Sequence, residues 1–149
     1  MRARSFVVLF SAMALAAVGV FAHHGSAVSY DLTQRVVLKG VVTDFKYINP
    51  HPAIFWDVTG NDGKVTHWTG EIAPNVAQLQ QNGWGRKRSE KALEAGTAVT
   101  VTVSPSRAGG PVGLVQRIES ASGEAILGEI GLGAGPGAGA PPPAAPTKQ

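Results

Sequence analysis

The sequence predicts an all-β domain with one short helix, folded as a small OB-like five-stranded barrel. Three observations lead to this prediction: five strand-like segments separated by turn-forming residues, one helical pattern between the third and the fourth, and a glycine inside an unusually long first strand. Three strands, a short helix and two further strands, with a bend in the first strand, is the order of an OB-type barrel. The alternative fold is a small open β-sandwich made of the same strands.

The first predicted strand covers residues 35–48, which are rich in β-branched and aromatic side chains. Gly40 lies near its middle, and a glycine there indicates a bend that lets one strand take part in two sheets. The second and third strands, residues 53–59 and 64–70, flank a Gly-Asn-Asp-Gly sequence typical of a hairpin turn. We therefore expect these two strands to pair antiparallel.

The helix is predicted over residues 74–83. Pro74 stands at its start, Val76 and Leu79 are three residues apart, and Gly83 follows its end. We interpret the basic residues of the next segment, 86–93, as a solvated turn, and the alternative is a patch that binds an anionic partner.

The fourth strand, residues 98–103, alternates valine and threonine, which predicts valines inward and threonines outward. Pro105 ends this strand. The fifth strand covers residues 113–120, with Leu114 and Ile118 in register, and the apolar residues 125–127 add a short edge strand.

Both ends of the chain are predicted to lie outside the barrel domain, residues 30–127. Residues 1–22 have the basic start, apolar run and small residues of a secretory signal peptide, cleaved after Ala22. The alternative, an uncleaved membrane anchor, needs about 20 apolar residues, and this run is shorter. We expect residues 23–29 to be a flexible mature N-terminus and the Gly/Ala/Pro-rich residues 128–149 to be disordered. The expected location is the periplasm or the medium, with no permanent membrane anchor.

Charge and cysteine content narrow the function classes. Removal of Arg2 and Arg4 with the signal leaves 11 of the 13 basic residues against 10 acidic ones, a net charge of about +1 in place of +3. This balance and an exported destination argue against nucleic acid as a partner. The chain has no cysteine, which excludes disulfides and a lipoprotein anchor.

An ordered set of short motifs runs through the mature chain. It comprises His23-His24, Tyr30-Asp31, Gly40-Val41-Val42, Asn49-Pro50-His51, Trp68 with Glu71, Pro74-Asn75, Gly83-Trp84 and Gly96. The set resembles an uncharacterised family of small exported bacterial proteins, a domain of unknown function with N-terminal His-His and Asn-Pro-His motifs. Thr97, where an acidic residue is expected, and the turn at 107–111 depart from the pattern. The resemblance implies an exported β-domain and assigns no activity.

The candidate site is built from histidines. The four in the chain are His23, His24, His51 and His67. Cleavage after Ala22 would give His23 a free α-amino group, and an amine with imidazoles suits copper, nickel or zinc. Pro50 and Pro52 hold His51 on a stiff corner. We expect a transition-metal site, with copper favoured over zinc, supported by Glu71, Trp68 and Asn49.

Each candidate residue also has a purely structural interpretation. His23 and His24 would then belong to a frayed terminus. His51 would hold the corner through a backbone hydrogen bond, and His67 would be a core or rim histidine beside Trp68. The three tryptophans are interpreted as packing residues rather than a stacking platform.

The sequence predicts a non-enzymatic binding protein. It has no cysteine nucleophile, no serine in a nucleophile elbow and no phosphate-binding loop. A copper-dependent oxidase, or a general acid–base enzyme that uses Glu71 with His51 or His67, are the enzymatic alternatives. The non-metal alternative is an OB-like module that binds a periplasmic partner protein or a small ligand near Trp68, Glu71 and the basic segment.

Overall fold

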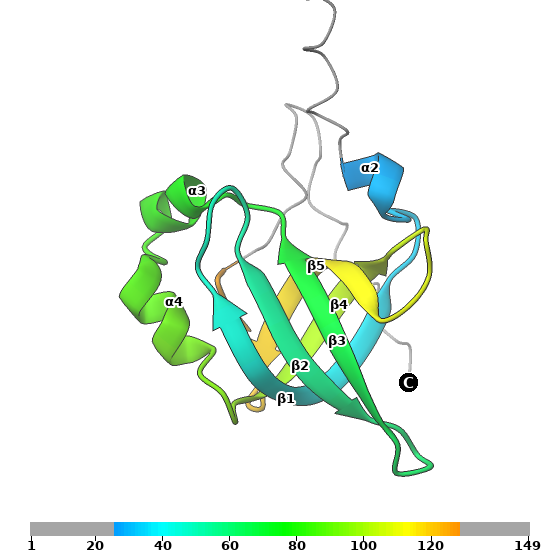
Figure 1. Ribbon diagram of the computed structural model, residues 1–149. Helices are drawn as coiled ribbons and strands as arrows, with labels where there is room; N and C mark the ends of the chain where they lie inside the picture. The colour runs from blue at the N-terminus through cyan, green and yellow to red at the C-terminus, as the bar shows by residue number, and fades with distance from the viewer. Residues whose placement is uncertain (1–25, 129–149) are drawn as a thin grey trace, which may run out of the picture.

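The structure is a computed structural model and describes residues 26–128. Within this range the strands curl into a barrel, with two short helices packed at one side of it and a third, very short helix at the start (Figure 1). In chain order the elements are α2 (Ser26–Ser29), β1 (Val36–Lys46), β2 (Ala53–Thr59), β3 (Val65–Ile72), α3 (Val76–Gln81), α4 (Arg86–Ala92), β4 (Ala98–Pro105), β5 (Val112–Ser120) and β6 (Ala125–Ile126).

The predicted five-stranded barrel is confirmed. The strands lie in the order β3-β2-β1-β4-β5-β6, and an additional pairing of β3 with β5 closes the sheet on itself. That pairing is parallel, whereas the other neighbours are antiparallel. An open sandwich would leave β3 and residues 112–115 of β5 unpaired on the sides that face each other here, so the hydrogen bonds between them exclude the alternative fold.

The long first strand serves two partners, as its glycine predicts. Residues 36–41 of β1 pair with β4, and residues 41–46 pair with β2. Gly40 stands at the change of partner, where an added Cβ would collide with the carbonyl oxygen of Asp57 and lie 2.8 Å from Cδ1 of Trp56. A register shift between Val42 and Asp44 bends the strand further. Because β1 bends here, it can contribute to both sides of the barrel.

The barrel interior is filled by alternate residues of the strands, in the pattern that the sequence predicts. Val99, Val101 and Val103 of β4 are buried, while Thr100 and Thr102 between them are partly exposed. Ile54 and Trp56 of β2 and Ile118 of β5 are completely buried in the same core. The alternation therefore follows from the opposite directions of successive side chains in a strand.

Helix α3 confirms the predicted helix, with slightly shorter bounds. Asn75 is its N-cap: its side chain accepts a hydrogen bond from the backbone of Gln78, and the Gln78 side chain accepts one from the backbone of Asn75. These two reciprocal hydrogen bonds give partners to two backbone N–H groups that have no acceptor within the helix. Leu79 is the residue that α3 buries in the core.

The interpretation of residues 86–93 as a solvated turn is wrong, because residues 86–92 form α4. Two arginines of this helix lie over aromatic rings, Arg86 over Tyr47 at 5.0 Å and Arg88 over Trp84 at 3.9 Å from the ring centroids. Ser89 is buried with its hydroxyl donating to the carbonyl of Trp84, and Leu93 is completely buried just after the helix. The barrel therefore carries more than the one helix predicted.

Two further differences concern the ends of the domain. Residues 26–29, expected to be flexible, form α2. The predicted edge strand is confirmed as β6 but ends at Ile126, since Leu127 has a positive φ of 63°. The predicted signal peptide and most of the predicted tail lie outside the described residues. None of the helices within residues 26–128 is long and apolar enough to span a membrane.

The closure of the barrel depends on two glycines, Gly70 of β3 and Gly113 of β5, which stand opposite each other. A Cβ added at Gly70 would lie 2.5 Å from Cγ2 of Val115, and one added at Gly113 would lie 2.7 Å from Cβ of Val103. Both positions therefore lack room for any side chain, because the core already fills the space.

We expect Gly70→Ala to destabilise the protein by about 1–3 kcal/mol, the usual cost of overpacking a core. Urea unfolding followed by tryptophan fluorescence measures the loss. The control is Gly85→Ser, at a glycine with no atom within 4 Å of an added Cβ, which should leave stability unchanged or slightly higher. Equal stability of Gly70→Ala and the wild type would contradict the tight closure.

Candidate functional site

The N-terminal segment, residues 27–35, is fastened across the outside of the barrel. Tyr30 forms a β-bridge with Ser106, and the Asp31 amide donates to the carbonyl of Pro105 at 2.8 Å. Arg107 holds the start of the segment, with its Nε donating to the carbonyl of Ala27 at 3.2 Å. In Figure 1, α2 lies at the same end of the barrel as the β1–β2 connection and the last residues of β3. We call this the β1–β2 end.

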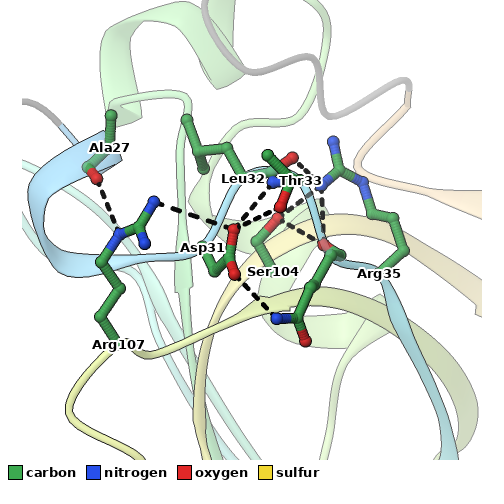
Figure 2. A network of polar contacts seen from close by, with 8 residues as sticks. Ala27, Asp31, Leu32, Thr33, Arg35, Ser104 and Arg107 are labelled. Atoms are coloured by element: carbon green, nitrogen blue, oxygen red, sulfur yellow. Dashed lines mark hydrogen bonds and ion pairs between the residues drawn. The ribbon is translucent and has the colours of Figure 1, made fainter.

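Figure 2 shows the polar network that anchors this segment. Asp31 accepts hydrogen bonds from the hydroxyl of Thr33 at 2.7 Å, from its backbone amide at 3.1 Å and from the Gln34 side chain at 2.8 Å. Arg107 lies 3.8 Å from the same carboxylate. The hydrogen bonds from Thr33, aided by Gln34 and Arg107, hold the pKa of Asp31 below its usual value.

A second anchor in the same network joins the segment to β4. Arg35 donates to the hydroxyl of Ser104 at 2.7 Å, and that hydroxyl donates to the carbonyl of Gln34 at 3.2 Å. Ser104 is completely buried. The segment is therefore held by charged and hydroxyl side chains at its middle and by backbone bonds at either side.

Tyr30 joins the N-terminal segment to β3. Its ring is buried, and its hydroxyl donates to Oε2 of Glu71 at 2.8 Å. Glu71 stands opposite Leu114 of β5, which is buried although it lies outside the core cluster of the barrel. The largest cause that raises the pKa of Tyr30 above its usual value is the burial of its side chain. The hydrogen bond to Glu71 and the negative charge of Glu71 raise this pKa further. The sequence offered the Tyr30-Asp31 pair only as part of a resemblance, so this contact is a finding of the structure.

His51 lies at the β1–β2 end. It is half-buried, and its Nδ1 is buried without a hydrogen-bond partner among the described residues. The neighbouring Pro52 accepts a hydrogen bond from the amide of Ile72, and Ala53 stands opposite Glu71. His51 thus lies two residues before Ala53, the residue of β2 that pairs with Glu71, and outside the strand itself. Asn49 lies in the same connection and is exposed.

His67 lies away from this end of the barrel. It stands opposite Asp57, and its Nδ1 lies 2.5 Å from the Asp57 carboxylate. Its side chain is 82% exposed, so it is neither a core nor a rim histidine. Four residues of β3 separate it from Glu71, which corresponds to about 13 Å along a strand. The structure therefore does not bring His67 together with His51.

Trp68 takes part in packing. Its ring is half-buried and stacks on the completely buried Trp56, with centroids 5.9 Å apart and planes at 27°. Within residues 26–128, no group of three or more His, Cys, Asp or Glu side chains is placed to hold a metal ion. His23 and His24 lie outside the described residues. The described part of the predicted site thus amounts to His51 with Glu71 beside it.

Comparison with known proteins identifies the family. A family model described as a family of unknown function (DUF6152) matches residues 11–116, well over half of the chain. The chain belongs to this family, which confirms the prediction of membership in an uncharacterised family. No curated protein and no solved structure matches the chain. The protein is thus a small β-barrel domain of a family whose function is unknown.

We expect Asp31→Asn to lower stability at pH 7 and the effect to vanish in acid. A carboxylate whose pKa is lowered in the folded state stabilises the fold above about pH 4, and this stabilisation is lost as the pH falls through the lowered pKa. Urea unfolding of both proteins between about pH 2.5 and 7 measures the difference. A difference in stability that stays constant over this range would contradict the anchoring role of the ionised carboxylate.

We expect Tyr30→Phe to cost about 0.5–1.5 kcal/mol, the usual contribution of one hydrogen bond. Because the raised pKa favours the protonated phenol in the folded state, the contribution is present below about pH 10 and is lost as the pH rises further. The stability of the wild type should therefore approach that of the variant in alkali. Urea unfolding of both proteins across about pH 7 to 11 tests this prediction. A stability difference between them that stays constant over this range would contradict the contribution of the hydrogen bond from Tyr30 to Glu71.

Proposed function

We propose that this protein is an exported, non-enzymatic protein that binds a transition metal, with copper favoured over zinc, at the β1–β2 end of its barrel. One observation carries the proposal: the chain before Tyr30 is fastened at the end of the barrel where His51 lies. Arg107 holds Ala27, and Tyr30 holds Glu71, which pairs with Ala53, two residues after His51. The predicted mature N-terminus therefore precedes a segment that is fastened at this end of the barrel.

Chain length supports the same arrangement. Two peptide units separate His24 from Ser26, so the two Cα atoms are at most about 7 Å apart. The histidines of the predicted mature terminus thus have a short tether to a fastened segment. With the α-amino group of His23, they supply the nitrogen donors that copper and zinc prefer.

The described residues offer two further donors. The buried Nδ1 of His51 has no partner among the described residues, and a buried polar atom in this state calls for a water, an ion or a ligand. Glu71 uses Oε2 for the Tyr30 hydroxyl, which leaves Oε1 as a donor or as a hydrogen-bond acceptor for a ligating imidazole. His67 takes no part, because its position beside Asp57 lies too far along β3.

Export and the absence of catalysis are parts of the proposal that rest on sequence. The basic and apolar start of the chain supports a periplasmic or secreted location. A general acid–base role for Glu71 has little support, since its carboxylate is bound by Tyr30. A metal titration also tests the two alternatives. One is a metal-free module for a partner protein or small ligand. The other is a copper-dependent oxidase, which needs an open coordination position on the metal.

We expect the mature protein to bind one Cu(II) ion per chain more tightly than micromolar. The protein is expressed with its own signal, mass spectrometry verifies that His23 is the first residue, and calorimetry follows Cu(II) and Zn(II). His51→Ala should weaken binding about tenfold or more, a loss at least equal to that for a residue supporting a ligand. The matched control is His67→Ala, which removes an exposed imidazole outside the site and should leave binding unchanged.

Two outcomes would reject the metal site. The first is binding weaker than micromolar by a correctly cleaved protein, which would favour the metal-free module. The second is an equal loss in the two histidine variants, which would indicate scattered surface binding. A copy extended by one alanine before His23 provides a further control, because the added residue moves the α-amino group away from the His23 imidazole.

A further inference from the structure

Helix α4 presents three exposed basic side chains for which the fold gives no acidic counterpart. Lys87, Arg88 and Lys91 are exposed, and no carboxylate of the described residues lies within ion-pair distance of them. Arg86 differs from them, since it pairs with Glu90 at 3.0 Å. We call Lys87, Arg88 and Lys91 the α4 basic face.

The stability of α4 does not explain these charges. Arg86, Lys87 and Arg88 open the helix, where the helix dipole disfavours positive charge, and the first turn has no acidic residue. Lys87 and Lys91 are four residues apart, so their like charges repel on one side of the helix. The N-cap, Gly85, contributes no side-chain hydrogen bond that would offset this. The basic residues of the first turn therefore weaken the helix that carries them, whereas the helix dipole favours Lys91 in the last turn.

Arg88 is held in place before any partner arrives. Its guanidinium lies 3.9 Å from the centroid of the Trp84 ring, and its Nη1 donates to the carbonyl of Gly83 at 3.1 Å. These two contacts leave the remaining guanidinium N–H groups available to a partner. An ordered arginine loses less side-chain entropy when it binds a carboxylate, and its planar group suits carboxylate geometry.

We propose that the α4 basic face binds an acidic segment of a partner protein through its carboxylates. The charge is complementary, and the exposed large apolar side chains of the described chain lie on other elements, at Val28, Val37, Val41, Ile48, Val65 and Val112. Helix α4 thus lacks the apolar side chains that a helix inserts into a lipid surface. In Figure 1, α4 and α2 lie on opposite sides of the barrel.

The test uses the mature protein and a fluorescently labelled hexaglutamate peptide, with binding followed by anisotropy at low salt. Lys87→Gln with Lys91→Gln leaves Arg88 on its ring and should weaken binding about fivefold, from two exposed charge pairs. The matched control, Lys39→Gln with Lys64→Gln, changes the net charge equally on other elements and should weaken binding less than about twofold. Adding Arg88→Gln to the first pair should weaken binding further.

Three results would overturn the proposal. One is the absence of peptide binding by the wild type. Another is an equal loss in the two double variants, which would assign binding to net charge alone. The third is tighter binding to phosphatidylglycerol vesicles than to the peptide, with the same dependence on Lys87 and Lys91, which would make the partner a membrane. Circular dichroism of each variant verifies that the fold is kept.

Discussion

The parallel pairing of β3 with β5 is the contact on which the rest of the structure depends. It joins residues about forty positions apart and closes the barrel through Gly70 and Gly113, where the core leaves no room for a Cβ. Closure removes two sheet edges, which matters for a chain without disulfides because unpaired edges promote aggregation. It also places Glu71 beside Leu114, and Glu71 accepts the hydrogen bond of the Tyr30 hydroxyl.

The N-terminal segment, residues 27–35, adds to this closed barrel the contacts on which the candidate site is based. A barrel of this size buries its apolar residues inside, so its outer surface needs separate polar contacts to hold a further segment. Asp31, Arg35 and Arg107 supply them, and Tyr30 adds a buried ring with a hydrogen bond to Glu71. The result is that residues 27–35 are held against the barrel by contacts independent of any ligand.

Helix α4 shows how one short element can serve packing and recognition together. Ser89 is buried within it and Leu93 directly after it, while the rings of Tyr47 and Trp84 hold two of its arginines. Those contacts keep a helix in place although its charges oppose the helix dipole. Of the lysines that remain, Lys87 opposes the dipole, and neither lysine makes an ion pair with the described residues, and this difference within one basic cluster is the basis for the proposed acidic partner.

The sequence by itself determined the strands, the hairpin, helix α3 and the order of the barrel. Valine alternation, turn-forming residues and capping residues act through the backbone over a few positions, so their effects can be predicted from neighbours. Tertiary structure alone decided that residues 86–92 are helical, since their rings and burial come from distant segments. It also separated His67 from His51 and joined Tyr30 to Glu71, because strand register and barrel closure set which distant side chains meet.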